Sequence, residues 1–118
     1  MEATLAFAQD PSQPPLSPAA SFIEQTGEAL YANICQGCHM EDGRGAVGAG
    51  AYPGLANNSN LEPRSYPVYV VLHGLKAMPP MEKMLSDEQV AAVVNYVRTH
   101  FGNVYTDSVT PQDVSEAR

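Results

Sequence analysis

Two cysteines and a histidine lie within five consecutive residues of this chain, Cys35-Gln36-Gly37-Cys38-His39. Two thiols at this spacing can add across the two vinyl groups of a haem as thioethers. The imidazole that follows can then lie under the iron as the proximal ligand. C-x-x-C-H is the sequence mark of c-type haem attachment. We therefore predict that Cys35 and Cys38 hold a haem covalently, that His39 binds its iron, and that the protein moves electrons.

Two other kinds of site also use a C-x-x-C pair. A structural zinc ion usually takes four Cys or His ligands. This chain has only two cysteines, and its other histidines, His73 and His100, are not at H-x3-5-H spacing. A redox-active dithiol would follow a strand and open a helix, whereas this motif closes a helix-like segment. Haem attachment is therefore favoured over zinc, and zinc over a dithiol switch.

The composition limits the size of the protein and the class of its partners. A length of 118 residues allows one small domain, and 10 prolines and 9 glycines predict many loops. A buried haem would give short helices an apolar body to pack around. The net charge is −7 and only 6 residues are basic, which argues against nucleic acid, because phosphate binding needs clusters of Lys and Arg. No apolar run approaches the length of a membrane span.

Residues 1–20 are expected to form a proline-rich tail. Four prolines between residues 10 and 20 favour an extended, polyproline-like backbone. Ala6-Phe7-Ala8 has the A-x-A pattern of a signal-peptide end, but no basic start precedes it and the apolar run is short. An ordinary N-terminus with an added methionine is preferred to a trimmed signal remnant. The expected periplasmic location depends instead on the haem motif, because bacteria normally attach haem covalently outside the cytoplasm.

Two predicted helices frame the motif. Ser21 and Glu24 have the S-x-x-E spacing of a capping box, and apolar residues at helical spacing lead from there directly into the motif. A rigid helix end would fix the thiols and the proximal ligand against the porphyrin. Ser86 and Gln89 form a second capping pair, ahead of a helix that Gly102 is expected to end.

Between these helices the sequence predicts loops and one short element. Residues 41–54 contain five glycines and are expected to form a flexible loop. Residues 67–72 are apolar and valine-rich, so a strand is one alternative. Pro67 at a plausible first helical position and Gly74 as a stop favour a short helix. The polar residues 105–118 are expected to be a C-terminal tail, which leaves a single domain over 21–104.

Met78 is the candidate for the second axial ligand. It lies in the segment A-M-P-P-M at 77–81, where Pro79 biases its backbone towards an extended conformation. Two prolines stiffen this loop, and a stiff loop can hold a weak thioether ligand at low entropic cost. A single Met in a loop is usually a packing residue, and Met81 and Met84 are the alternatives. His/Met ligation fills both axial positions, raises the reduction potential and suits electron transfer rather than oxygen chemistry.

Residues 21–101 resemble a class I cytochrome c of the small bacterial kind. Gly27 and Tyr31 precede the haem motif at the spacing by which that family's first helix crosses its last, and Val93 and Tyr96 match the partner positions. A glycine at the crossing lets two helix backbones approach closely. The resemblance implies an all-α fold, with three to five short helices around one covalently bound haem.

The resemblance extends to the loops on both sides of the haem. Residues 42–45 (D-G-R-G) and 52–55 (Y-P-G-L) are similar to the family's loop under the haem, where a proline carbonyl accepts a hydrogen bond from the proximal histidine. Carried over, this contact joins the Pro53 carbonyl to His39 Nδ1 and tunes the iron. The A-M-P-P-M segment resembles the family's A-M-P-x-aromatic loop, with Met78 as ligand and Met81 in place of the aromatic.

The remaining candidate residues each have a structural alternative. Tyr52 and Leu55 are assigned to the haem pocket with the loop that contains them. Arg44 is either the partner of a haem propionate, which guanidinium binds well, or a solvated loop residue. Lys76 would lie near the exposed haem edge, as a docking residue or a plain surface lysine. His73 is expected to be a surface or packing histidine.

The predicted function is that of a single-haem electron carrier and not of an enzyme. Residues 95–98, 102–103 and 109–114 resemble cytochrome subunits or domains that serve bacterial dehydrogenases. This similarity implies a periplasmic dehydrogenase as donor, and a cytochrome or terminal oxidase of a respiratory chain as acceptor. The alternative is a haem sensor or peroxidase-like protein with an open sixth iron position, which requires Met78 to be displaced or never bound.

Overall fold

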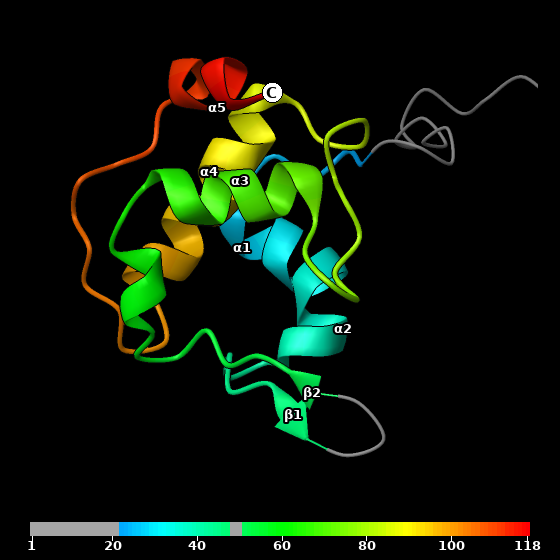
Figure 1. The fold of residues 1–118 in the computed structure, drawn as a ribbon, viewed down its shortest axis with the longest axis vertical. Helices are drawn as coiled ribbons and strands as arrows, with labels where there is room; N and C mark the ends of the chain where they lie inside the picture. The colour runs from blue at the N-terminus through cyan, green and yellow to red at the C-terminus, as the bar shows by residue number, and fades with distance from the viewer. Residues whose placement is uncertain (1–21, 48–50) are drawn as a thin grey trace, which may run out of the picture.

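The computed structural model describes residues 22–47 and 51–118, so the expected tail over 1–20 and the predicted cap Ser21 lie outside the described residues. The described chain is mostly helical, with one small antiparallel hairpin (Figure 1). In chain order the elements are α1 (Gly27–Leu30), a π-helical turn (Tyr31–Cys35), α2 (Gln36–His39), β1 (Ala46–Val47), β2 (Ala51–Tyr52), a 3-10 turn (Ser59–Leu61), α3 (Ser65–His73), α4 (Asp87–Thr99) and α5 (Pro111–Ala117).

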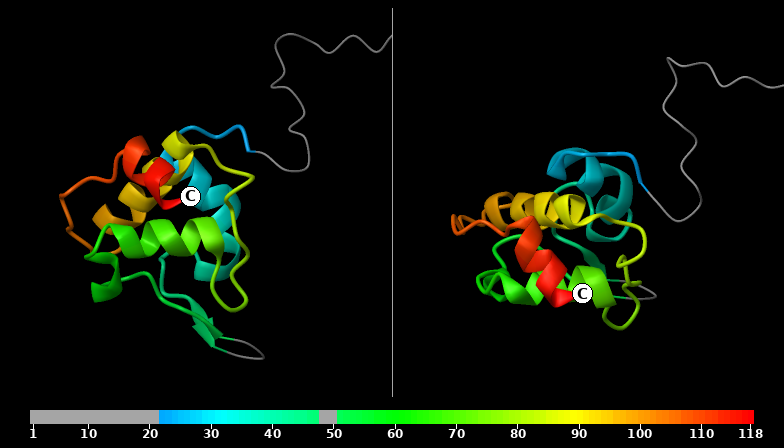
Figure 2. Two further views of the ribbon diagram at one scale, coloured as in Figure 1. Left: turned by 45° about the horizontal axis from the view of Figure 1, so that its top comes forward. Right: turned by 90° about the horizontal axis from the view of Figure 1, so that it is seen from above.

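Helix α4 is the central element of the molecule. Seen from above, it lies between α1 on one side and α3 with α5 on the other (Figure 2). Its buried apolar residues meet those of all three neighbours. The core consists of Leu30, Tyr31, Leu61, Val68, Leu72, Leu85, Val90, Ala91, Val93, Val94, Val97, Val109 and Val114. Within the described residues, none of the helices is long and apolar enough to cross a membrane.

The first helix begins later than predicted. Thr26, in an extended conformation, caps it by accepting a hydrogen bond from the Ala29 amide at 3.2 Å, and Glu24 lies ahead of the helix. From Gly27 the helix continues through the π-helical turn into α2. The haem motif is therefore still at the end of a continuous helical segment.

The resemblance implies that the family's first helix crosses its last. In this structure α1 crosses α4 in that way. A Cβ built on Gly27 would lie 2.3 Å from the Ala92 carbonyl oxygen and 2.7 Å from Tyr96 Cβ. No side chain fits there, so glycine sets the distance between the two helices. The rings of Tyr31 and Tyr96 pack beside this point, with centroids 5.6 Å apart.

The capping box that opens α4 is confirmed. Ser86 Oγ accepts from the Gln89 amide at 3.1 Å, and Gln89 Oε1 accepts from the Ser86 amide at 2.8 Å. The helix ends at Thr99, earlier than the predicted stop, and the chain then turns through Phe101 and Gly102, both at positive φ. The short helix predicted over 67–72 is also confirmed. It begins at Ser65, so Pro67 lies in its first turn, and it ends at His73, directly before Gly74, whose φ is +74°.

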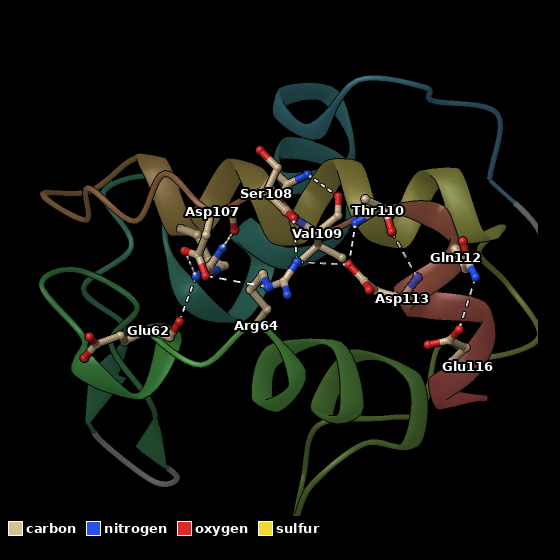
Figure 3. A network of polar contacts seen from close by, with 11 residues as sticks. Glu62, Arg64, Asp107, Ser108, Val109, Thr110, Gln112, Asp113 and Glu116 are labelled. Carbon is tan, nitrogen blue, oxygen red and sulfur yellow. Dashed lines mark hydrogen bonds and ion pairs between the residues drawn. The ribbon is translucent and has the colours of Figure 1, made fainter.

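The expected C-terminal tail is folded in the structure. Helix α5 opens with a capping box between Thr110 and Asp113, and Val114 is fully buried. The physical reason is a set of arginines that bind this segment. Arg98, fully buried at the end of α4, donates to the Asp107 carbonyl and carboxylate. Arg64 donates to the Ser108 carbonyl at 3.1 Å (Figure 3).

Candidate functional site

The two cysteines of the motif lie one helical turn apart. Cys35 ends the π-helical turn and is half-buried, and Cys38 lies in α2 and is exposed. Residues three apart on a helix point to the same side. Burial, together with the neighbouring Cys38, raises the pKa of the Cys35 thiol to about 11. A reactive redox cysteine needs a lowered pKa, so this environment does not favour the dithiol alternative.

His39 is oriented by a backbone carbonyl. Its Nδ1 lies 2.8 Å from the Pro53 carbonyl oxygen, which is the contact that the resemblance implies. A carbonyl only accepts hydrogen bonds, so Nδ1 must be the protonated nitrogen of this pair. The lone pair of the neutral ring then lies on Nε2, which is the atom left for a metal.

Glycines close the loop that brings Pro53 to His39. Gly45 has a φ of +70°, its amide donates to the His39 carbonyl at 3.0 Å, and a Cβ at this position would lie 2.0 Å from the Tyr52 carbonyl oxygen. β1 and β2 pair across the same loop, with Ala46 opposite Tyr52. In the described part of the segment predicted as a flexible loop, two short strands are therefore paired beside the end of α2 (Figure 1).

A buried tyrosine fixes the other end of this loop. The hydroxyl of Tyr31 donates to the Met40 carbonyl at 2.6 Å, directly after the haem motif, where Met40 has a φ of +68°. Burial raises the pKa of Tyr31 to about 12, so the hydroxyl stays a donor throughout the neutral range. This role of Tyr31 is not visible in the sequence, which indicated only a helix-crossing residue.

The backbone of Met78 is held in a tight turn. Leu75 and Met78 exchange two backbone hydrogen bonds, of 3.1 and 2.9 Å. Gly74 makes this turn possible, because a Cβ there would lie 2.6 Å from the Met78 carbonyl oxygen. The Met81 amide donates to the Val71 carbonyl at 2.9 Å. This hydrogen bond attaches the C-terminal end of the loop to α3 as well.

The two methionines of this loop differ in their surroundings. Met81 packs against the hydrophobic core, and Met78 is half-buried at the turn. In Figure 1 the loop descends on the side of the molecule where α2 lies. A core-packed thioether has a structural role already, so the surroundings favour Met78 over Met81 as the residue available to a ligand site.

The other predicted residues lie in the hairpin or beside it. Leu55 packs against the core, while Tyr52 remains 42% exposed. The Arg44 side chain is 81% exposed and lies 3.7 Å from the Asp42 carboxylate. An exposed ion pair of this kind contributes little to stability. Lys76 is exposed in the turn before Met78.

The residues present fit a covalently bound haem. The donor set consists of two thiols on one helical turn, an imidazole whose Nε2 has no hydrogen bond to the described residues, and a thioether on a loop held by backbone hydrogen bonds. Half-buried apolar side chains that pack against the core lie close to these donors in the sequence or in the loop hydrogen bonds, and an apolar porphyrin requires such neighbours. They are Ile34, Leu55, Val71 and Met81.

Sequence reasoning missed the arginines that organise the C-terminal segment. Arg98 falls on the apolar face of α4, one helical turn after Val94, and it donates to the carbonyls of Leu61 and Glu62 at 2.8 and 2.7 Å. A basic residue within an apolar helical stripe, followed by Asp107, was the available signal. His73 Nε2 lies 2.9 Å from the Ala117 carbonyl, so this histidine does pack, but against α5.

The comparisons with known proteins identify the family to which the chain is similar. The family model described as "Cytochrome C oxidase, cbb3-type, subunit III" matches residues 24–97. The cytochrome c subunit of the quinone-dependent alcohol dehydrogenase of Gluconacetobacter polyoxogenes is 33% identical over 95% of this chain and 26% of its own length. The fructose dehydrogenase cytochrome subunit of Gluconobacter japonicus is 32% identical over 78% of this chain and 22% of its own length.

A smaller relative matches over most of its own length. Cytochrome c-552 of Thermus thermophilus is 32% identical over 65% of this chain and 69% of the relative. In contrast, the chain spans about a quarter of the length of the dehydrogenase subunits that it matches.

Proposed function

Since this chain belongs to the cytochrome c family, we propose that Cys35 and Cys38 form the thioether bonds to its haem, with His39 as the proximal iron ligand. The protein is an electron carrier with covalently bound haem c. When bound, the haem supplies an iron that cycles between the ferric and ferrous states. The observation that supports the assignment best is the C-x-x-C-H helix with His39 Nδ1 on the Pro53 carbonyl.

In this proposal His39 and Pro53 act as one unit. The carbonyl holds the proton on Nδ1, orients the ring and makes Nε2 a stronger donor to the iron. The hairpin that contains Pro53 is itself closed by Gly45. The ring orientation therefore depends on backbone geometry and not on a side chain that could change rotamer.

Met78 is proposed as the second axial ligand. Its backbone is held by the Leu75 turn, so little conformational entropy is lost when the thioether binds. Two ligands on rigid supports keep the coordination nearly unchanged between the two redox states. Such a site suits electron transfer rather than oxygen chemistry.

Haem attachment can be tested with cysteine variants. We expect the haem of the wild-type protein to stay with the polypeptide during acid–acetone extraction. The double variant Cys35→Ser/Cys38→Ser should lose its haem to the solvent phase. Retention of haem by the double variant would contradict the proposed thioether bonds.

The proposed partners are a dehydrogenase as electron donor, and a cytochrome or terminal oxidase as acceptor, in the periplasm. The names of the relatives support the donor, since several are cytochrome subunits of alcohol, fructose or gluconate dehydrogenases. Copurification with such an enzyme at a fixed ratio from native extract would support the proposal. Monomeric behaviour in the same extract, with no dehydrogenase attached, would count against it.

A further inference from the structure

The last described residue reaches back to the segment that follows Met78. The guanidinium of Arg118 donates to the carbonyls of Glu82 and Leu85 and pairs with the Asp87 carboxylate, at 2.6 Å for Nε to Oδ1. Both side chains of this ion pair are mostly buried, with 27% and 32% exposed. One side chain therefore bonds the chain between the Met78 turn and α4 at two points, and the first residue of α4 at a third.

A second contact joins the same elements. His73, at the end of α3, places Nε2 2.9 Å from the Ala117 carbonyl and Nδ1 3.9 Å from the Glu82 carboxylate. The amide of Glu82 donates to the Leu72 carbonyl at 3.2 Å. These contacts thus connect three segments, which are the end of α5, the end of α3 and the chain that follows Met78.

Helix α5 is also fixed at its other end. Asp107 and Ser108 accept hydrogen bonds from Arg98 and Arg64, and Asp113 pairs with Arg64 at 3.4 Å (Figure 3). Val109 and Val114 are buried against the core between these two ends. Because α5 is held at both ends, it can transmit a positional constraint from the buried Arg98 to the loop that contains Met78.

We propose that Arg118 is a positioning residue for the haem site. Through its hydrogen bonds to the Glu82 and Leu85 carbonyls it holds the segment that follows Met78 in place, and so keeps the Met78 thioether on the iron. We call these contacts the latch. This proposal rests on Met78 being the sixth ligand. It assigns a role to α5, which lies beyond the residues matched by the family model.

The consequence of the latch can be measured by ligand competition. An added ligand such as imidazole binds the ferric iron only when Met78 has left it. The apparent affinity for imidazole is then proportional to the population of that open state. Removal of the Arg118 contacts should raise this population, and with it the imidazole affinity, by about threefold to tenfold, since charge-assisted hydrogen bonds are the stronger ones.

The experiment compares Arg118→Met with Arg64→Met in the holoprotein. Arg64 also bonds the C-terminal segment, through Ser108 and Asp113, but it has no bond to residues 74–87. We expect tighter imidazole binding and a lower reduction potential for Arg118→Met only. Equal shifts in the two variants would show a general loss of stability, and no shift in Arg118→Met would show no coupling. Either result would overturn the proposal.

A second variant keeps the test valid if Arg118→Met does not fold. His73→Phe removes the bond to Ala117 and leaves a ring beside Tyr69, whose centroid now lies 4.6 Å from that of His73. It should raise imidazole affinity in the same direction, and an unchanged affinity would contradict the latch. If Met78→Ala itself binds imidazole no more tightly than wild type, the proposed ligation fails. If only the latch variants behave as wild type, the latch alone fails.

Discussion

At the scale of single residues, the site depends on where one proton lies. The Pro53 carbonyl holds the proton of His39 on Nδ1 and leaves Nε2 for the iron. The carbonyl reaches the ring because Gly45, at a φ of +70°, lets the hairpin fold back within contact distance. The orientation of the proposed iron ligand thus depends on a glycine that contacts only the backbone carbonyl of His39 and not its ring.

Gly45→Ala should disturb this contact and raise the reduction potential. A Cβ at Gly45 would overlap the Tyr52 carbonyl, and a non-glycine residue at positive φ costs about 1–3 kcal/mol. A weaker hydrogen bond makes the imidazole a poorer donor, which favours ferrous iron. Redox titration and urea unfolding measure the two effects. Val47→Ala, whose side chain is 93% exposed in the same hairpin, is the control. An unchanged potential in Gly45→Ala would refute this account of the Pro53 contact.

At the scale of elements, the haem motif is positioned by a helix crossing. Helix α1 can lie against α4 because Gly27 has no Cβ to meet the Ala92 carbonyl. The helical segment then continues from this contact into Cys35. The placement of the thiols therefore depends on the distance between two helix backbones.

Gly27→Ala should destabilise the whole fold. The added methyl group would lie 2.3 Å from a backbone oxygen, so the helices must separate, and overpacking of this kind typically costs about 1–3 kcal/mol. Urea unfolding of the holoprotein would measure the loss. Gly37→Ala is the matched control, because a Cβ at Gly37 meets no atom of the described residues within 4 Å. Equal stability of the two variants would mean that the crossing tolerates a side chain.

The elements that sequence analysis predicted well are those with local signals. The capping box of Ser86 and Gln89 and the stop at Gly74 each depend on a few neighbouring residues, and both are present. Helix α5 was expected to be a tail, because its stability comes from Arg64, which is distant in sequence, and from Arg98, which belongs to the preceding helix. A polar composition alone cannot show that a segment is held by arginine side chains from other elements.

The features of the site also divide into those with a local sequence signal and those without one. The C-x-x-C-H motif and the methionine loop are visible as short patterns. The His39–Pro53 contact was available only through a family resemblance. The Arg118 contacts to Glu82 and Leu85 followed from neither, because they join residues brought together by the packing of α5.

At the scale of the whole molecule, charge is distributed unevenly. Three of the 6 basic residues, Arg64, Arg98 and Arg118, hold the C-terminal segment. Lys76 and Lys83 are exposed and both lie in the segment around Met78. The protein has a net charge of −7, and these two exposed lysines lie within five residues of Met78 in the sequence. We propose that they steer a partner with an acidic surface.

The C-terminal attachment should weaken in acid. Hydrogen bonding from Arg98 lowers the pKa of Asp107, and hydrogen bonding from Thr110 lowers the pKa of Asp113. A carboxyl group with a lowered native pKa stabilises the fold fully above its unfolded value of about 4, and this contribution is lost as the pH falls through the native value.

Unfolding in urea at a series of pH values from neutral to about 3 would measure this dependence. We expect Asp107→Asn to be less stable than wild type at neutral pH and to show a shallower fall in acid. A wild-type pH dependence in this variant would show that Asp107 does not contribute to it. The variant leaves the haem ligands untouched, so its absorption spectrum should be unchanged.

The most direct test of the central claim is the visible spectrum of the oxidised protein. His/Met ligation predicts a low-spin ferric spectrum with a weak red iron–sulfur band. This band should disappear in Met78→Ala and persist in Met81→Leu and Met84→Leu. A band that survives in Met78→Ala, or a high-spin ferric spectrum in the wild-type protein, would contradict the electron-transfer site described for His39 and Met78.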